Sequence, residues 1–164
     1  MGCRGVLFAL DSSQDAALVA TRDDDEVLEF VDALEAAWDW DWLCEVDKAW
    51  DALHRCLGDG TLELGRSGGD PLARALLGGA HHYEGEEYVV AHVRAKQVTA
   101  VAAALDGLDQ AWLRERYDAI DPDDYDGVLD DGDFEYTWTY LQDVRSFYRR
   151  AADGGRSVIF TVDQ

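Results

Sequence analysis

The sequence predicts an α+β fold, in which about six helices cover a small mixed sheet of three strands or slightly more. Three observations carry this prediction. The chain has 164 residues, of which 48% are hydrophobic, and this is enough for the core of a single compact domain spanning residues 1–164. Three short apolar segments are typical of strands. Between them, apolar residues recur at the spacing of amphipathic helices.

The three expected strands lie at the two ends and in the middle of the chain. Val6–Leu10 is a continuous apolar run, as is typical of a buried strand. Tyr88–Val93 is mostly apolar and β-branched, and Ser157–Val162 closes the chain in the same way. Because helical segments separate all three, the sequence favours one sheet covered by helices.

Three helices are expected in the first third of the chain. Ser12 caps a short one. Asp23, with Glu26 three residues later, opens a second helix, and further acids in its first turn suit the helix dipole. A third helix is expected from about Asp47 to Leu57, with Gly58 as its stop.

The remaining helices follow the same signals. Pro71 starts a short helix that Gly78 and Gly79 end. Gly154 and Gly155 supply a left-handed stop for the last one. Apolar residues at helical spacing mark three longer segments: Val98–Leu105, Trp112–Tyr117 and Asp133–Ala152.

The chain is strongly acidic, which limits the classes of partner that it can bind. Its 35 Asp and Glu residues against 14 Lys and Arg residues give a net charge of −21 at pH 7. Such a chain repels nucleic acid and anionic lipid, so we expect neither as a partner. No apolar run approaches the roughly 20 residues of a membrane span, and the first one is too short for a signal peptide. We therefore expect a cytoplasmic protein of undetermined oligomeric state.

Few motifs point to chemistry. Cys3, Cys44 and Cys56 match no zinc or disulfide framework, so we expect reduced thiols. The sequence contains no nucleophile elbow, Walker loop or dinucleotide fingerprint, and we expect no cofactor. Nothing in the sequence requires catalysis; the question of an enzyme stays open, and a non-catalytic role is favoured.

The segment from Asp47 to His54 is the most informative. Helical spacing would place Asp47, Trp50 and His54 on adjoining turns of one side, where an acid, an indole and an imidazole could line a pocket. Gly78 and Gly79 would allow a ligand to approach the backbone closely. The structural interpretation is favoured over this one: Asp47 as a helix N-cap, Trp50 as a core anchor and His54 at the edge of an apolar stripe.

Tryptophan and aspartate alternate strictly from Trp38 to Trp42. Not all three indoles can be buried on one face. Exposed Trp40 and Trp42 would be anchors for a protein partner, because aromatic residues contribute much of the affinity at interfaces. Packing of the same rings over the core is an equally good interpretation.

Two segments resemble metal sites without meeting their requirements, so no native metal is expected. The acidic loop Asp118–Asp133 can be aligned with a calcium loop only by placing Pro122 at the first ligand and Asp133 where glutamate is needed. The other segment has no helical His pair to fix its geometry. Its nitrogen and oxygen ligands are His81, His82, Glu84, Glu86, Glu87 and His92.

Several of these segments resemble the YfbM-like family of bacterial proteins, a domain of unknown function. The likeness rests on Met1-Gly2 before a strand, on Asp47–His54, and on Pro71-Leu72 leading to Leu77-Gly78-Gly79. It continues through the helix at 98–105, the sequence at 116–118 and the closing helix and strand. The resemblance implies a compact α+β domain without an agreed activity.

Two functions from different classes remain. The first is a non-catalytic, acidic protein-binding module that engages a basic protein partner, of which an immunity-like inhibitor of a basic toxin is one version. The alternative is a small-molecule or enzymatic site around Asp47, Trp50 and His54. Adaptation to a GC-rich genome or a salty cytosol would also account for the acidity without any partner.

Overall fold

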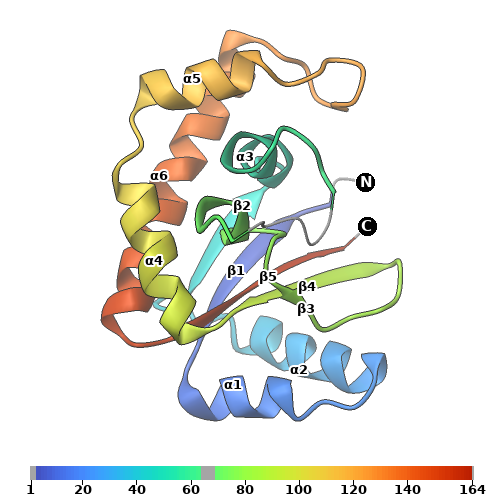
Figure 1. The fold of residues 1–164 in the computed structure, drawn as a ribbon. Coiled ribbons are helices and arrows are strands. Elements are labelled where there is room, and N and C mark those ends of the chain that lie inside the picture. The colour runs from blue at the N-terminus through green and yellow to red at the C-terminus, as the bar shows by residue number, and fades with distance from the viewer. Residues whose placement is uncertain (1–2, 64–68, 164) are drawn as a thin grey trace.

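The computed structural model describes residues 3–63 and 69–163 (Figure 1). Met1 and Gly2, which open the family resemblance, lie outside the described residues. A five-stranded antiparallel sheet with the order β2-β1-β5-β4-β3 forms its centre. The strands are β1 (Gly5–Leu10), β2 (Leu43–Asp47), β3 (Ala80–His81), β4 (Tyr88–Val93) and β5 (Ser157–Asp163).

Within residues 3–63 and 69–163, six α-helices and one 3-10 turn surround this sheet, which confirms the α+β prediction. Two points differ from it: the sheet has five strands rather than three, and every strand pair is antiparallel rather than mixed. The helices are α1 (Ser12–Val19), α2 (Asp24–Ala37), α3 (Trp50–Leu57), η1 (Leu72–Arg74), α4 (Ala95–Asp106), α5 (Gln110–Asp118) and α6 (Asp131–Asp153).

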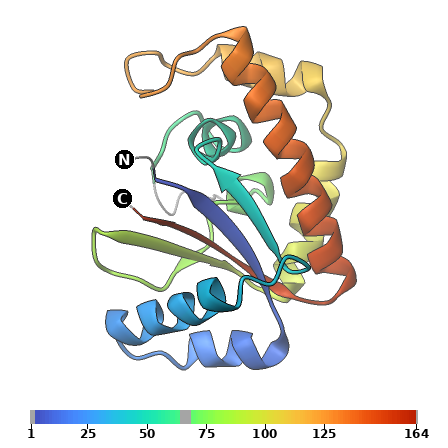
Figure 2. The same ribbon diagram turned by 180° about the vertical axis from the view of Figure 1, so that it is seen from behind.

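The helices form a layer on each face of the sheet. Figures 1 and 2 show α1 and α2 together on one side and α3 to α6 on the other. Side chains alternate along a strand, so Val6 and Phe8 of β1 join the core beneath α1 and α2, whereas Leu7 joins the larger core beneath α3 to α6. Burial on both faces explains why β1 is a continuous apolar run.

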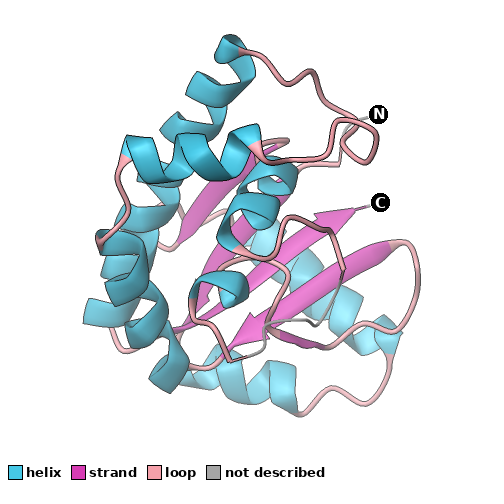
Figure 3. Cartoon of the chain, turned by 45° about the horizontal axis from the view of Figure 1, so that its top comes forward, coloured by secondary structure: helices cyan, strands magenta, loops and turns pink. Residues whose placement is uncertain are grey.

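Figure 3 shows the helices around the strands of the sheet. Aspartates are the N-caps of α1, α2, α5 and α6. The side chain of Asp23 accepts a hydrogen bond from the backbone N–H of Glu26, as the sequence predicts. Asp11, rather than Ser12, caps α1 and completes a capping box with Gln14. Helix α2 ends at Trp38, which adopts a left-handed conformation with φ 41°.

Strand β2 is the main element that the sequence did not predict. It occupies Leu43–Asp47, where the alternating Trp-Asp segment and an expected helix start obscured a short strand. The prediction that Asp47 begins a helix is therefore wrong: Asp47 ends β2 with φ 46°, and α3 starts at Trp50. The hydrogen bonds of β2 to β1 place it at one edge of the sheet, beside α6.

Candidate functional site

The segment that the sequence singled out runs from the end of β2 into α3. Trp50 lines a hollow of about 630 Å³ together with Lys48, Tyr125 and Tyr136. The Nε1–H of Trp50 donates to the backbone carbonyl of Cys3 at 3.0 Å. The indole is therefore half-buried with its polar atom satisfied, and one side of it faces the hollow.

His54 lies on the same helix but does not line the Trp50 hollow. Only 6% of His54 is exposed, and burial lowers its pKa to about 4. The imidazole is thus neutral at pH 7 and sits in the core. The structure does not bring His54 and Trp50 together at one hollow.

Asp47 belongs to a different hollow from Trp50. Its Oδ2 accepts a hydrogen bond from the hydroxyl of Tyr136 at 2.9 Å, and its Oδ1 lies 3.5 Å from Nε of Arg4. The N-cap position of α3 is Ala49, which makes no side-chain cap. The expected capping role of Asp47 is therefore wrong, and its carboxylate instead connects the end of β2 to α6.

The two glycines of the predicted site face the protein's own backbone. A Cβ atom on Gly78 would lie 2.0 Å from the carbonyl oxygen of Ala73, and one on Gly79 would lie 2.6 Å from that of His92. These distances are far below any contact between non-bonded atoms. The absence of side chains at Gly78 and Gly79 is thus required by close packing within the chain.

The three tryptophans between α2 and β2 have different surroundings. Trp38 packs edge-on against Phe8, with ring centroids 6.3 Å apart. The guanidinium carbon of Arg156 lies 3.6 Å from the ring centroid of Trp42, so this indole is covered. Trp40 is 64% exposed and touches Trp38 edge-on at 5.7 Å. Of the two expected anchors, Trp40 is the one presented to solvent.

Two adjoining hollows border β2. One of about 560 Å³ lies between β2 and α6 and is lined by Trp40 and Tyr136, and the other, of about 530 Å³, is lined by Asp47 and Tyr88. Both hollows are lined by Glu45 and Tyr140. We call this surface the acidic aromatic face. Its charged members are Asp32, Glu35, Glu45, Asp47, Asp143, Asp163, Arg4 and Arg150, and its aromatic members are Trp38, Trp40, Tyr88, Tyr136, Tyr140 and Phe147.

The tyrosines of this face are held in place by carboxylates. The hydroxyl of Tyr88 donates to Glu35 at 2.8 Å, as that of Tyr136 does to Asp47. Burial, together with these neighbouring carboxylates, raises the pKa of Tyr88 and of Tyr136. Both phenols therefore stay protonated and act as hydrogen-bond donors at any physiological pH.

No single stretch of sequence marks these tyrosines. Tyr136 and Tyr140 share a face of α6 through their i, i+4 spacing, and their rings lie 4.8 Å apart. Only the position of β2 beside α6 brings them to Glu45. Since β2 was not predicted, neither was this face.

Other acids of the candidate segments have structural partners. Arg55, only 2% exposed, makes ion pairs of 2.6 Å with Asp51 and with Asp124. Asp133 accepts hydrogen bonds from the hydroxyls of two tyrosines, at 2.6 Å and 3.0 Å. Part of the acidic loop Asp118–Asp133 is thus fixed to the core rather than solvated.

The cysteines are free thiols. Burial raises the pKa of Cys44 and of Cys56 to about 12, so neither is a thiolate nucleophile at neutral pH. Within residues 3–63 and 69–163, no group of three or more His, Cys, Asp or Glu side chains has the geometry to hold a metal ion. The same residues include no helix with the length and apolar character needed to span a bilayer.

Comparison with known proteins shows similarity to uncharacterised ones. The profile of DUF1877, a domain of unknown function, matches residues 1–161. The crystal structure of YfbM from Escherichia coli, a protein of unknown function, is similar with a TM-score of 0.67 at 21% identity, covering 97% of this chain and 99% of that chain. At this identity the similarity shows the fold alone. No curated protein matches the chain.

Proposed function

The chain belongs to the DUF1877 family, a domain of unknown function, and from that premise we propose that it is a non-catalytic, acidic protein-binding module for a basic protein partner. The proposed docking surface is the acidic aromatic face. The observation that carries the proposal is the composition of its two adjoining hollows: six carboxylates and two guanidinium groups among aromatic walls.

The chemistry of the face suits arginine and lysine side chains. Carboxylates accept charge-assisted hydrogen bonds from guanidinium and ammonium groups, and indole or phenol rings attract the same cations across their faces. The net charge of −21 would also speed the encounter with a basic partner at low ionic strength.

Trp40 is the proposed anchor of the interface. A 64% exposed indole at the rim of a hollow is costly to leave in water, and tryptophan is enriched among residues that dominate binding energy. Its edge-on contact with Trp38 limits its rotation, so less conformational entropy is lost on binding.

An immunity-like inhibitor is one form that such a module takes. A surface of carboxylates can occupy the cationic active site of a nuclease, where the phosphates of the substrate otherwise bind. The alternative, a small-molecule or enzymatic site around Asp47, Trp50 and His54, has less support because the three side chains do not share a hollow.

The test starts with recovery of the tagged protein from its own cells at low salt and identification by mass spectrometry of what rising salt releases. The released partner is then purified and its Kd measured. We expect Trp40→Ala to weaken binding by about thirtyfold, as for an interface anchor. Val19→Ala on α1, another exposed apolar residue that lines neither hollow, serves as the control and leaves the Kd unchanged.

The electrostatic part has its own test. Glu45→Gln with Asp143→Asn should slow association several-fold at low salt, whereas Glu115→Gln on α5 should not. At about 0.5 M salt the Debye length falls to a few ångström, so the affinity should be weaker than at low salt. An affinity that is the same at both salt concentrations would contradict the proposal. So would full affinity in Trp40→Ala.

A further inference from the structure

The Trp50 hollow, of about 630 Å³, has three aromatic residues in its walls: Trp50 of α3, Tyr125 of the loop between α5 and α6, and Tyr136 of α6. The polar atom of each ring donates a hydrogen bond within the chain. Their acceptors are the carbonyl oxygen of Cys3 at 3.0 Å, Oδ2 of Asp133 at 3.0 Å and Oδ2 of Asp47 at 2.9 Å. What these three residues offer to a ligand is therefore the carbon surface of their rings.

The wall formed by the loop between α5 and α6 is held by Arg55, which is 2% exposed. Its Nη1 pairs with Oδ2 of Asp124 at 2.6 Å, and its Nη2 donates to the backbone carbonyl of Asp124 at 2.8 Å. Its guanidinium carbon also lies 5.9 Å from the ring centroid of Tyr125. A wall that is fixed before a ligand arrives reduces the entropy lost on binding.

The charges of the lining favour a cation. Among the described residues that line the hollow, four are aspartates, whereas Lys48 alone is basic. Burial raises the pKa of Asp51 despite its ion pair with Arg55, and the neighbouring carboxylate of Asp126 raises it further. A cation in the hollow would offset this negative potential.

Three of the four carboxylates already accept hydrogen bonds within the chain. Their donors are Nε of Arg55 to Asp51 at 2.6 Å, the hydroxyls of Tyr117 and Tyr125 to Asp133, and the backbone N–H of Asp133 to Asp130 at 2.8 Å. A primary ammonium group has three N–H donors and needs acceptors to replace its hydrogen bonds to water. A quaternary ammonium group has no N–H, so negative charge and aromatic walls are sufficient for it.

We propose that the Trp50 hollow binds a trimethylammonium group, with the rings of Trp50, Tyr125 and Tyr136 as its walls. Val128, which is 72% exposed and lines the same hollow, adds an apolar contact for the methyl groups. The site goes beyond the docking surface proposed above. Among the described lining residues, the two surfaces share only Tyr136.

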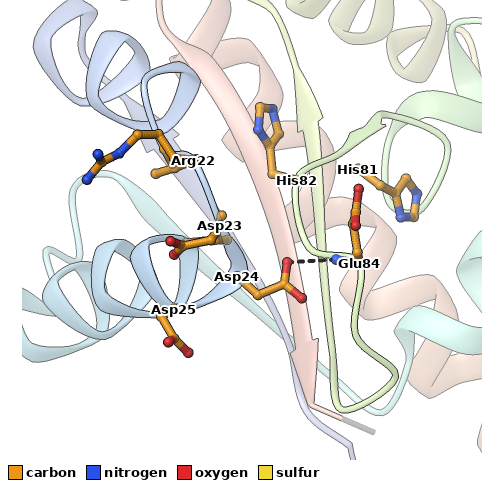
Figure 4. Close-up of a pocket in the computed structure, with 9 residues that line it drawn as sticks. Arg22, Asp23, Asp24, Asp25, His81, His82 and Glu84 are labelled. Carbon is orange, nitrogen blue, oxygen red and sulfur yellow. Dashed lines mark hydrogen bonds between the residues drawn. The ribbon is translucent and has the colours of Figure 1, made fainter.

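A second acidic hollow, of about 580 Å³, does not have these features. Figure 4 shows Arg22–Asp25 on one side of it and His82 and Glu84 on the other. Asp24 accepts hydrogen bonds from the backbone N–H of Glu84 at 2.9 Å and of Gly85 at 3.0 Å. The described part of its lining includes no tryptophan, tyrosine or phenylalanine, so we assign no ligand to it.

Two kinds of small molecule carry a trimethylammonium group: a choline-type alcohol and a betaine-type zwitterion. The carboxylate of a zwitterion would pair with the exposed ammonium group of Lys48 in the lining. Choline and glycine betaine are therefore the two probes, and the tighter one identifies the source.

The first test measures the affinity of each probe by NMR titration and compares choline with two analogues. The alcohol 3,3-dimethylbutan-1-ol has the shape of choline without its charge, and ethanolamine has the charge without the methyl groups. We expect each analogue to bind about tenfold more weakly than choline. The N-methyl protons of bound choline should shift upfield and show nuclear Overhauser contacts to the rings of Trp50 and Tyr125.

The second test uses variants of Tyr125, because Trp50 also packs against Phe160 in the core, with ring centroids 6.1 Å apart. Tyr125→Leu should weaken choline binding about tenfold, whereas Tyr125→Phe keeps the ring and should keep the affinity. Trp40→Ala is the matched control, since Trp40 is an exposed aromatic residue of the docking surface and should not affect choline. Circular dichroism verifies that each variant is folded.

Three results would overturn the inference. Neither probe binding at about 10 mM would exclude the ligand class. Equal affinity for 3,3-dimethylbutan-1-ol, or tighter binding of ethanolamine, would refute recognition of a methylated cation by the rings. Full affinity in Tyr125→Leu would place the cation elsewhere. None of these results bears on the docking surface, whose own test is the effect of Trp40→Ala on a protein partner.

Discussion

The buried imidazole of His54 makes the stability of the fold depend on pH in a calculable way. In the unfolded chain a histidine takes up a proton near pH 6.5, whereas burial lowers the pKa of native His54 to about 4. Below pH 6.5 the unfolded state therefore binds more protons than the native state, and the free energy of unfolding falls as the pH falls. The stabilisation is complete above pH 6.5 and is lost towards pH 4.

The size of the effect follows from the two pKa values. Between pH 7.5 and pH 5.0 they predict a loss of about 2 kcal/mol from His54 alone. The range stops at pH 5.0 because the pI is about 4.2, and a protein near its pI precipitates. Other groups also contribute to the pH dependence of stability, so a variant is needed to isolate the contribution of His54.

Urea unfolding of wild type and His54→Gln at both pH values provides that comparison. The variant has no imidazole at position 54, so its free energy of unfolding should fall by about 2 kcal/mol less than that of the wild type over the same range. Leu53 is a buried neighbour of His54 on α3, so Leu53→Ala controls for destabilisation alone. Its free energy of unfolding should fall between the two pH values by as much as that of the wild type. If the free energy of unfolding of His54→Gln fell by as much as that of the wild type between pH 7.5 and pH 5.0, the argument would be refuted.

Three further predictions concern stability at neutral pH and can be read from thermal or urea unfolding. Gly78→Ala should cost about 3 kcal/mol, because its Cβ would lie 2.0 Å from a backbone oxygen; an unchanged midpoint would contradict the packing. Arg55→Leu should cost about 3 kcal/mol because it leaves the mostly buried carboxylate of Asp51 unpaired, and adding Asp51→Asn should recover part of that loss. Tyr136→Phe should cost about 1 kcal/mol through the lost hydrogen bond to Asp47, a loss absent in an Asp47→Ala background.

The elements with strong local signals were predictable from the sequence. The apolar run at Val6–Leu10 predicted β1 to within one residue, and the acid-capped, periodic segment before Gly154 predicted α6 to within two. In each of these elements, the apolar residues that become buried follow one another, or recur at helical spacing, within a single continuous segment. Strand β2 has no such pattern, since its residues are Leu, Cys, Glu, Val and Asp. It forms because its backbone pairs with that of β1.

The candidate sites depend on contacts between distant residues, which no local pattern contains. His92 and Asp15 are separated by 77 positions, and Tyr136 and Asp47 by 89. His82 and His92 belong to the set of nitrogen and oxygen ligands that the sequence offers for a metal, but in the fold their imidazoles form a hydrogen bond with each other. Residue types in the sequence thus indicated which side chains belong to the candidate sites. The pairing of strands in the antiparallel sheet determines which of these side chains contact one another.

The acidity of the chain divides into two groups with different roles. Several aspartates serve the fold: the side chains of Asp11, Asp23, Asp109 and Asp130 accept hydrogen bonds at the first turns of four helices. General adaptation to salt would spread the remaining charge evenly over the surface, whereas the hollows beside β2 gather carboxylates around aromatic rings.

Stability at low salt separates these two explanations of the acidity. If self-repulsion among the excess charges is a cost of adaptation alone, the free energy of unfolding should rise steeply with salt, and neutralising Glu45 should help no more than neutralising Glu115. If the acidic aromatic face is a functional surface, its carboxylates repel one another locally. Glu45→Gln should then stabilise the unbound protein more than Glu115→Gln does, while weakening its binding to a basic partner.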